Sequence, residues 1–115
     1  MLSIEGLREY GADVDTGLKR CMGSEEFYLK MVRMIRNEEK FSVLEEALEQ
    51  NDLQSAFEAA HALKGLFGNL ALTPLFEPVS ELTELLRAYT QMDYSEYRQK
   101  ITEAKETLDE MIDSL

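Results

Sequence analysis

The chain has 115 residues, 44% of them hydrophobic, which suits one domain with its own core. Twelve basic and 23 acidic side chains give a net charge of -11. Phosphate backbones and anionic lipid surfaces repel such a chain, so we expect neither a nucleic-acid partner nor a membrane partner. A single cysteine and a single histidine exclude an internal disulfide and a four-ligand Cys/His zinc site within one chain.

The N-terminus lacks the basic region and the unbroken apolar run of a signal peptide. The most apolar stretch, residues 66–76, is interrupted by polar residues, glycine and proline and is too short to cross a bilayer. We therefore expect a cytoplasmic protein. We also expect residues 1–115 to be a freestanding single domain, since little of the chain lies beyond one bundle.

Apolar residues recur at helical spacing, whereas no segment alternates apolar and polar residues over six positions, so an all-α fold is predicted. The first part of the chain is expected to hold one or two short helices. Ser24, followed by two glutamates, is a predicted N-cap for the next helix. The expected packing side chains of these segments are Ile4, Leu7, Val14 and Leu18, then Phe27, Met31, Met34 and Ile35.

An amphipathic stretch at residues 41–48 comes next, and Asp52 is the predicted N-cap of a helix reaching residue 70. Another helix begins at Pro74 or, because an internal proline removes a backbone donor, near Pro78. A long amphipathic helix over residues 93–114 opens with Asp93 and Glu96 as a capping box. Main helices joined by short connections predict an up-and-down antiparallel four-helix bundle, capped by the short N-terminal helices.

His61 is the only histidine, and imidazole is the side chain that keeps a large neutral, nucleophilic fraction near neutral pH. At about 100° per residue it points away from the apolar stripe of its own helix, with Lys64, Gly65 and Gly68 on its side. Each glycine inside a helix costs about 1 kcal/mol relative to alanine. The two glycines either leave open space in front of the imidazole or allow a neighbouring helix to pack closely. An accessible nucleophile, a cation and cleared space indicate a transferable phosphoryl group.

The segment His-Ala-Leu-Lys-Gly at residues 61–65, followed by Gly-Asn-Leu at 68–70, resembles the signature of histidine-containing phosphotransfer (HPt) domains. The Gly-Leu-x-Arg-x-x-Gly stretch at 17–23 and the apolar spacing on both sides of the signature extend the resemblance over about residues 11–87. The resemblance implies that His61 accepts and donates a phosphoryl group and that Lys64 stabilises it. It also implies that Gly65, with Gly68 as a second position, gives steric clearance.

A phosphorelay intermediate of this kind would take the phosphoryl group from the phosphoaspartate of a response-regulator receiver domain and pass it to an aspartate of another receiver. The expected partners are receiver domains and, through them, a sensor histidine kinase. No cofactor of its own is expected, and magnesium would be on the receiver. With no ATP-binding loop, the chain is predicted not to be a kinase or other enzyme. We expect a monomer. Met31 and Met34 are candidates for the docking surface, with core packing expected for at least one of them.

Three residues depart from the family pattern. Phe67 stands where a small residue is usual, but its angular position on the core side predicts repacking and not blockage. Ala71 replaces a usual glycine, and Pro78 interrupts a helix that is usually regular. The side chain that often reaches the histidine from that helix cannot be assigned in this sequence.

Two alternatives remain open. Glu58 and His61 fit the Glu-x-x-His spacing of ferritin-like di-iron bundles, but that site needs a second such motif, which one histidine cannot supply unless the chain dimerises through the site. The other alternative is an adaptor bundle that binds a receiver without phosphotransfer. Replacing His61 distinguishes it, because only in a phosphorelay intermediate does the replacement abolish transfer while leaving binding intact.

Overall fold

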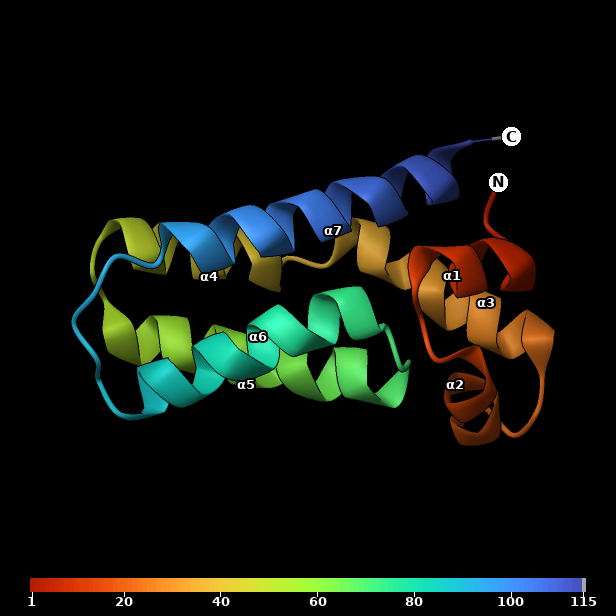
Figure 1. Cartoon of the computed structure of the whole chain (residues 1–115), viewed down its shortest axis with the longest axis horizontal. Helices are drawn as coiled ribbons and strands as arrows, with labels where there is room; N and C mark the ends of the chain where they lie inside the picture. Colours follow the sequence, from red (N-terminus) through yellow and green to blue (C-terminus); the bar gives the residue numbers. More distant parts are fainter. Residues whose placement is uncertain (115) are drawn as a thin grey trace.

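The computed structural model describes residues 1–114, and every regular element in this part of the chain is a helix, which confirms the all-α prediction. Four longer helices lie alongside one another, and each runs against the direction of the one before it (Figure 1). They are α4 (Lys40–Glu49), α5 (Leu53–Asn69), α6 (Thr73–Arg87) and α7 (Ser95–Asp113).

The N-terminal helices gather at one end of these four, beside the end of α5 and the start of α6 (Figure 1). They are α1 (Ile4–Tyr10), α2 (Val14–Arg20), α3 (Glu25–Arg33) and the 3-10 turn η1 (Met34–Asn37). The expected packing residues Leu7 and Val14 are buried here, with Ile4 and Leu18 partly buried against the core. None of the helices is long and apolar enough to cross a membrane in the part of the chain that the structure describes.

Of the three predicted capping residues, two are confirmed. The Ser24 hydroxyl accepts a hydrogen bond from the Phe27 amide at 3.1 Å, and the Asp52 carboxylate accepts one from the Ser55 amide at 3.1 Å. The capping box at Asp93 is wrong, because α7 begins at Ser95 and the N-cap residue makes no side-chain bond. Asp93 instead accepts a hydrogen bond from the Ser95 amide at 2.9 Å, in a turn just ahead of the helix.

The second proline does not delay the start of α6, which begins at Thr73 and continues through Pro78. Pro78 has no amide hydrogen for the carbonyl of Pro74, so one hydrogen bond is lost close to the helix start. Pro78 is buried, as are Leu75 and Val79 of the same helix. Burial of this apolar face offsets the missing hydrogen bond. The sequence pattern could not show this burial and therefore could not decide where the helix begins.

The buried face of α3 differs from the predicted one. Tyr28 and Val32 are fully buried, whereas Phe27 is 40% exposed and Met34 is 61% exposed. The expectation that Phe27 packs in the core is therefore wrong, whereas the exposed Met34 fits its alternative prediction as a surface residue. The helix is rotated by about one residue relative to the predicted stripe, and it tightens into η1 at Met34. Ile35 is buried as predicted, and Met31 packs partly buried against the core.

Tyr28 ties the N-terminal helices to the end of α5. Its hydroxyl donates a hydrogen bond to the Leu70 carbonyl at 2.8 Å, and its ring lies over Gly17 of α2. A Cβ atom at Gly17 would lie 2.6–2.8 Å from the Tyr28 ring, which is closer than packed atoms approach. The Asp13 amide also donates to the Ala71 carbonyl at 2.9 Å. These contacts hold α2 against the segment that follows α5.

We expect Gly17→Ala to destabilise the protein by about 2 kcal/mol. The methyl group displaces the Tyr28 ring and weakens its buried hydrogen bond, and these costs exceed the helix propensity gained by alanine. Urea denaturation followed by circular dichroism measures the free energy of unfolding. The matched control is Gly65→Ala, since a Cβ atom there meets nothing within 4 Å. Equal stability of the two variants would contradict the packing assigned to Gly17.

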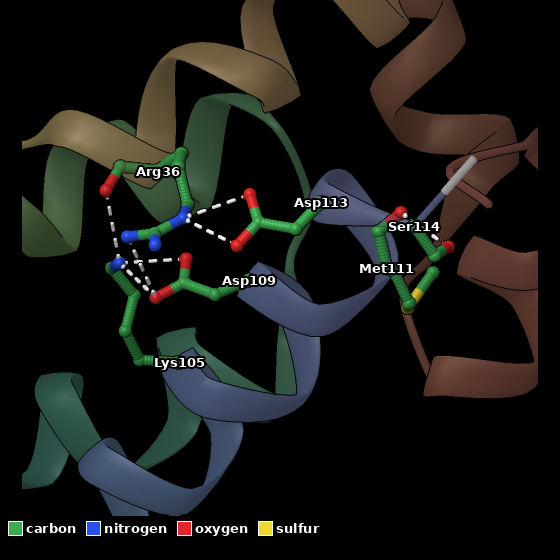
Figure 2. A network of polar contacts seen from close by, with 6 residues as sticks. All are labelled: Arg36, Lys105, Asp109, Met111, Asp113 and Ser114. Atoms are coloured by element: carbon green, nitrogen blue, oxygen red, sulfur yellow. Dashed lines mark hydrogen bonds and ion pairs between the residues drawn. The ribbon is translucent and has the colours of Figure 1, made fainter.

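The far end of α7 is joined to η1 by charged side chains (Figure 2). The Arg36 guanidinium binds the Asp113 carboxylate at 3.0 Å and lies 3.6 Å from that of Asp109. The Lys105 ammonium binds Asp109 at 2.6 Å and the Arg36 carbonyl at 3.3 Å. Lys105 and Asp109 are largely buried, with side chains 15% and 19% exposed, so this cluster fixes α7 beside η1.

Candidate functional site

The predicted site residues form one stripe along the exposed side of α5. His61, Lys64, Gly65 and Gly68 are spaced by one helical turn or two and therefore share a face. His61 is exposed, which confirms that it points away from the core. The opposite face of α5 is buried and consists of Leu53, Ala56, Ala59, Ala60, Leu63 and Phe67.

A shallow surface cleft of about 340 Å³ opens along this stripe. It is formed by three helices, because α2 supplies Arg20 and α6 supplies Phe76 in addition to the face of α5. All four predicted residues line it. The complete lining is Arg20, His61, Lys64, Gly65, Gly68, Asn69 and Phe76.

The two glycines of the stripe have different surroundings. A Cβ atom at Gly65 would meet nothing within 4 Å, so no packing contact requires glycine there. A Cβ atom at Gly68 would lie 3.2 Å from Cε1 of Phe76, a tight contact with the neighbouring helix. Close helix packing therefore explains Gly68, whereas it does not explain Gly65. Glycine lowers helix propensity at position 65, and no packing contact in the described structure compensates for this cost. This favours a functional reason for keeping the space at Gly65 open.

The imidazole of His61 is stacked on the ring of Phe57, one turn earlier on α5. The ring centroids are 5.6 Å apart and the planes are inclined by 13°. The Arg87 guanidinium of α6 also lies over the Phe57 ring, 5.0 Å from the ring centroid. The stack limits the rotation of the imidazole and holds it on the surface without using a ring nitrogen.

We expect Phe57→Leu to move the ring-proton resonances of His61 downfield, because the aromatic ring current of Phe57 is removed. The chain has one histidine, so these resonances need no assignment. A one-dimensional proton NMR spectrum measures the change. Arg87→Gln is the control, since it leaves the Phe57 ring in place and is expected to shift the same resonances much less. Unchanged resonances in Phe57→Leu would show that the rings are not stacked in solution.

An acidic residue of α6 lies near the cations of the site. Glu84 binds the Arg87 guanidinium at 3.0 Å. The hydrogen bond and the charge of Arg87 lower the pKa of the Glu84 carboxyl, and the charges of Lys64 and His61 lower it further. Glu84 and Arg87 therefore pair with each other at the side of the site that α6 forms.

Two cations face the cleft without a carboxylate partner. Among residues 1–114, neither Arg20 nor Lys64 forms an ion pair. The Arg20 guanidinium donates instead to the Gly68 carbonyl, near the end of α5. Both side chains line the same cleft as His61, Lys64 from α5 and Arg20 from α2.

The departures at Phe67 and Ala71 have local explanations. Phe67 is fully buried and packs against Phe41 with ring centroids 5.5 Å apart, so its predicted position on the core side is confirmed. Ala71 has a φ of 53°, the left-handed conformation that favours glycine. The alanine thus accepts backbone strain at the turn after α5. Neither residue lines the cleft.

Sequence reasoning missed several contributors to this site. Arg20 was visible only as part of a family-like stretch far from His61 in the chain. The spacing of four residues between Phe57 and His61 could have indicated their contact, whereas Phe76, Glu84 and Arg87 carried no signal of their own. Met31 and Met34, by contrast, are not among the residues that line the cleft. In residues 1–114 no group of three or more His, Cys, Asp and Glu side chains is gathered as for a metal, so Glu58 and His61 do not fit a carboxylate-bridged di-metal site within one chain.

A family model described as the Hpt domain matches residues 34–115, well over half of the chain. The matched residues include α4 to α7 and the whole stripe on α5, whereas α1 to α3 lie ahead of them. No significant match is found among curated proteins or among solved structures.

Proposed function

Because the chain belongs to the Hpt domain family, we propose that it is a phosphorelay intermediate that carries a phosphoryl group on His61 between receiver domains. The observation that supports this most directly is the exposed imidazole beside Gly65, where a side chain would meet only open space. A second protein can approach the histidine there without displacing any part of this chain. Lys64 lies one turn away on the same face and can stabilise the transferred group.

The proposed reaction is an in-line displacement at phosphorus. A ring nitrogen of neutral His61 attacks the phosphoaspartate of a receiver, a P–N bond forms, and the P–O bond to the aspartyl carboxylate breaks. The carboxylate leaves with the bonding electron pair, and the reverse displacement on a second receiver restores the imidazole. Lys64 offsets the negative charge of the phosphoryl oxygens during both steps. Magnesium and most of the catalytic groups belong to the receiver in this proposal.

The roles that we propose for the helices and for the two glycines follow from this reaction. Helices α4 to α7 act as an up-and-down antiparallel bundle that presents the stripe on α5, with residues 1–115 as one domain and the N-terminal helices as its cap. Gly65 provides clearance for the receiver, and Gly68 adds to it while packing against Phe76. The protein works as a monomer in the cytoplasm, where receiver domains and their sensor histidine kinase meet it.

Incubation with a receiver domain carrying labelled phosphoaspartate, in the presence of magnesium, tests the proposal. Label is expected on this chain in a form that acid removes and alkali leaves, as for phosphohistidine. A second, unphosphorylated receiver is then expected to remove the label. Binding of the receiver without any transfer, across several cognate receivers, would favour the non-catalytic adaptor instead and would leave Lys64 and Gly65 as docking residues.

A further inference from the structure

The imidazole of His61 has a covered side and an open side along α5. Residues 57, 61 and 65 lie one helical turn apart on the same face. Side chains of a helix lean toward its N-terminus, and the imidazole accordingly stacks on Phe57, with ring centroids 5.6 Å apart. One turn in the other direction, a Cβ atom at Gly65 would meet nothing within 4 Å. A phosphoryl donor can therefore approach from the Gly65 side, whereas Phe57 lies on the opposite side.

The orientation of the imidazole comes from this stack and not from a hydrogen bond. A functional histidine is commonly oriented by a bond from its second ring nitrogen to a carboxylate or a carbonyl. Within residues 1–114, His61 makes no such bond. An exposed side chain without a partner changes rotamer within picoseconds to nanoseconds. Contact with the Phe57 ring restricts this motion.

The geometry of the stack suits a nucleophile. The planes of the two rings are inclined by only 13°. The lone pair of a neutral imidazole nitrogen lies in the plane of its ring, so it is directed nearly parallel to the Phe57 ring and not into it. Phe57 thus holds the imidazole by its face and does not compete for the electron pair that attacks phosphorus.

Phe57 is itself held in place from two directions. Its ring is partly buried and packs against the hydrophobic core. The Arg87 guanidinium of α6 lies over the ring, 5.0 Å from the centroid, and the Glu84 carboxylate binds that guanidinium at 3.0 Å. A ring that the core and a second helix both contact is a firmer support for His61 than a free surface side chain.

We propose that Phe57 is a positioning residue for phosphoryl transfer, whose ring preorganises the His61 imidazole for a donor that arrives from the Gly65 side. This inference rests on the proposed function of His61. Phe57 touches no reacting atom and takes no part in making or breaking a bond. It reduces the number of orientations that the imidazole must give up when it aligns with phosphorus. The rate of transfer to His61 therefore depends on an aromatic ring at position 57, which a purely structural role of Phe57 does not require.

The test uses phosphoramidate, a small phosphoryl donor, so that docking of a receiver does not enter the measurement. A ring nitrogen of His61 forms a P–N bond, the P–N bond of the donor breaks, and ammonia leaves with the bonding electron pair. Phe57→Leu is expected to lower the rate constant about fivefold, because the imidazole is no longer preoriented. Phe57→Tyr keeps the ring and is expected to restore the rate to within about twofold of the wild type. Proton NMR gives the titration midpoint of His61 in each variant, so that rates are compared per neutral imidazole.

Two further variants separate positioning from other roles. Tyr97→Leu is the matched control, because it removes a partly buried ring of α7 that also has a lysine ammonium over it, 5.9 Å from the centroid. This variant is expected to react at the wild-type rate. Arg87→Gln keeps the Phe57 ring and removes the cation over it, and is expected to lower the rate by no more than about twofold. Thermal unfolding is measured for every variant.

Several results would overturn the inference. Phe57→Leu could react with phosphoramidate as fast as the wild type and slow transfer from a receiver alone, which would make Phe57 a docking residue. A Phe57→Tyr variant as slow as Phe57→Leu, with a matching loss of thermal stability in both, would assign Phe57 to packing only. An equal loss of rate in Arg87→Gln would assign the effect to the charge of Arg87. The failure of the proposed function is distinct, because the wild-type protein would then acquire no phosphohistidine from a receiver or from phosphoramidate.

Discussion

His61→Gln is expected to reduce phosphoryl transfer from a phosphorylated receiver to background while the helical fold persists. Glutamine is polar, has good helix propensity and is exposed at this position, so the free energy of unfolding should change by no more than about 0.5 kcal/mol. Its amide nitrogen has no available lone pair and cannot attack phosphorus. Since the chain contains one histidine, no other imidazole can take its place.

Label retained on the chain after separation from the receiver measures this effect, with binding followed in parallel by calorimetry. The variant is expected to bind the receiver with little change, because the clearance at Gly65 and the cation at Lys64 remain. Lys64→Gln is the matched control and is expected to slow transfer about tenfold without abolishing it, since it removes a stabilising charge and leaves the nucleophile. Acid-labile label on His61→Gln would refute His61 as the acceptor.

Gly65→Leu is expected to slow transfer from a receiver about hundredfold while making the protein more stable. A larger residue in place of glycine raises helix propensity by up to about 1 kcal/mol, and a Cβ atom at this position meets nothing within 4 Å of the chain. The cost arises only in the complex, where the side chain occupies the space through which a receiver approaches His61. A displacement of about 1 Å in the reacting geometry is enough for an effect of this size.

Transfer rates and urea denaturation of the same preparations provide the two measurements. Gly68→Ala is the comparison, because its methyl group meets Phe76 at 3.2 Å and the packing strain offsets the gain in helix propensity. Its stability is therefore expected to stay near that of the wild type. Phosphoramidate should still phosphorylate Gly65→Leu, since a small donor needs less space than a receiver. Normal transfer from a receiver would show that Gly65 clears no approach path.

Features that depend on neighbours in sequence were predictable. The N-caps at Ser24 and Asp52 follow from side chains that bond to amides three residues ahead. The outward direction of His61 and the inward direction of Phe67 follow from the helical repeat alone. Pro74 and Pro78 each marked a possible start of α6, and helical periodicity could not choose between the two starts. The burial that compensates for the hydrogen bond missing at Pro78 comes from other helices.

The sequence by itself thus determined the all-α class, the stripe of His61, Lys64 and Gly65, and the family, since helix periodicity and capping are short-range properties. Only the tertiary structure decided that Arg20 reaches the cleft and that Arg87 of α6 lies over the Phe57 ring. It also separated the two glycines, because packing against Phe76 explains one and open space surrounds the other. The contacts of Arg20, Arg87 and Phe76 join residues of different helices, and their distances depend on how the helices pack together, which no local pattern encodes.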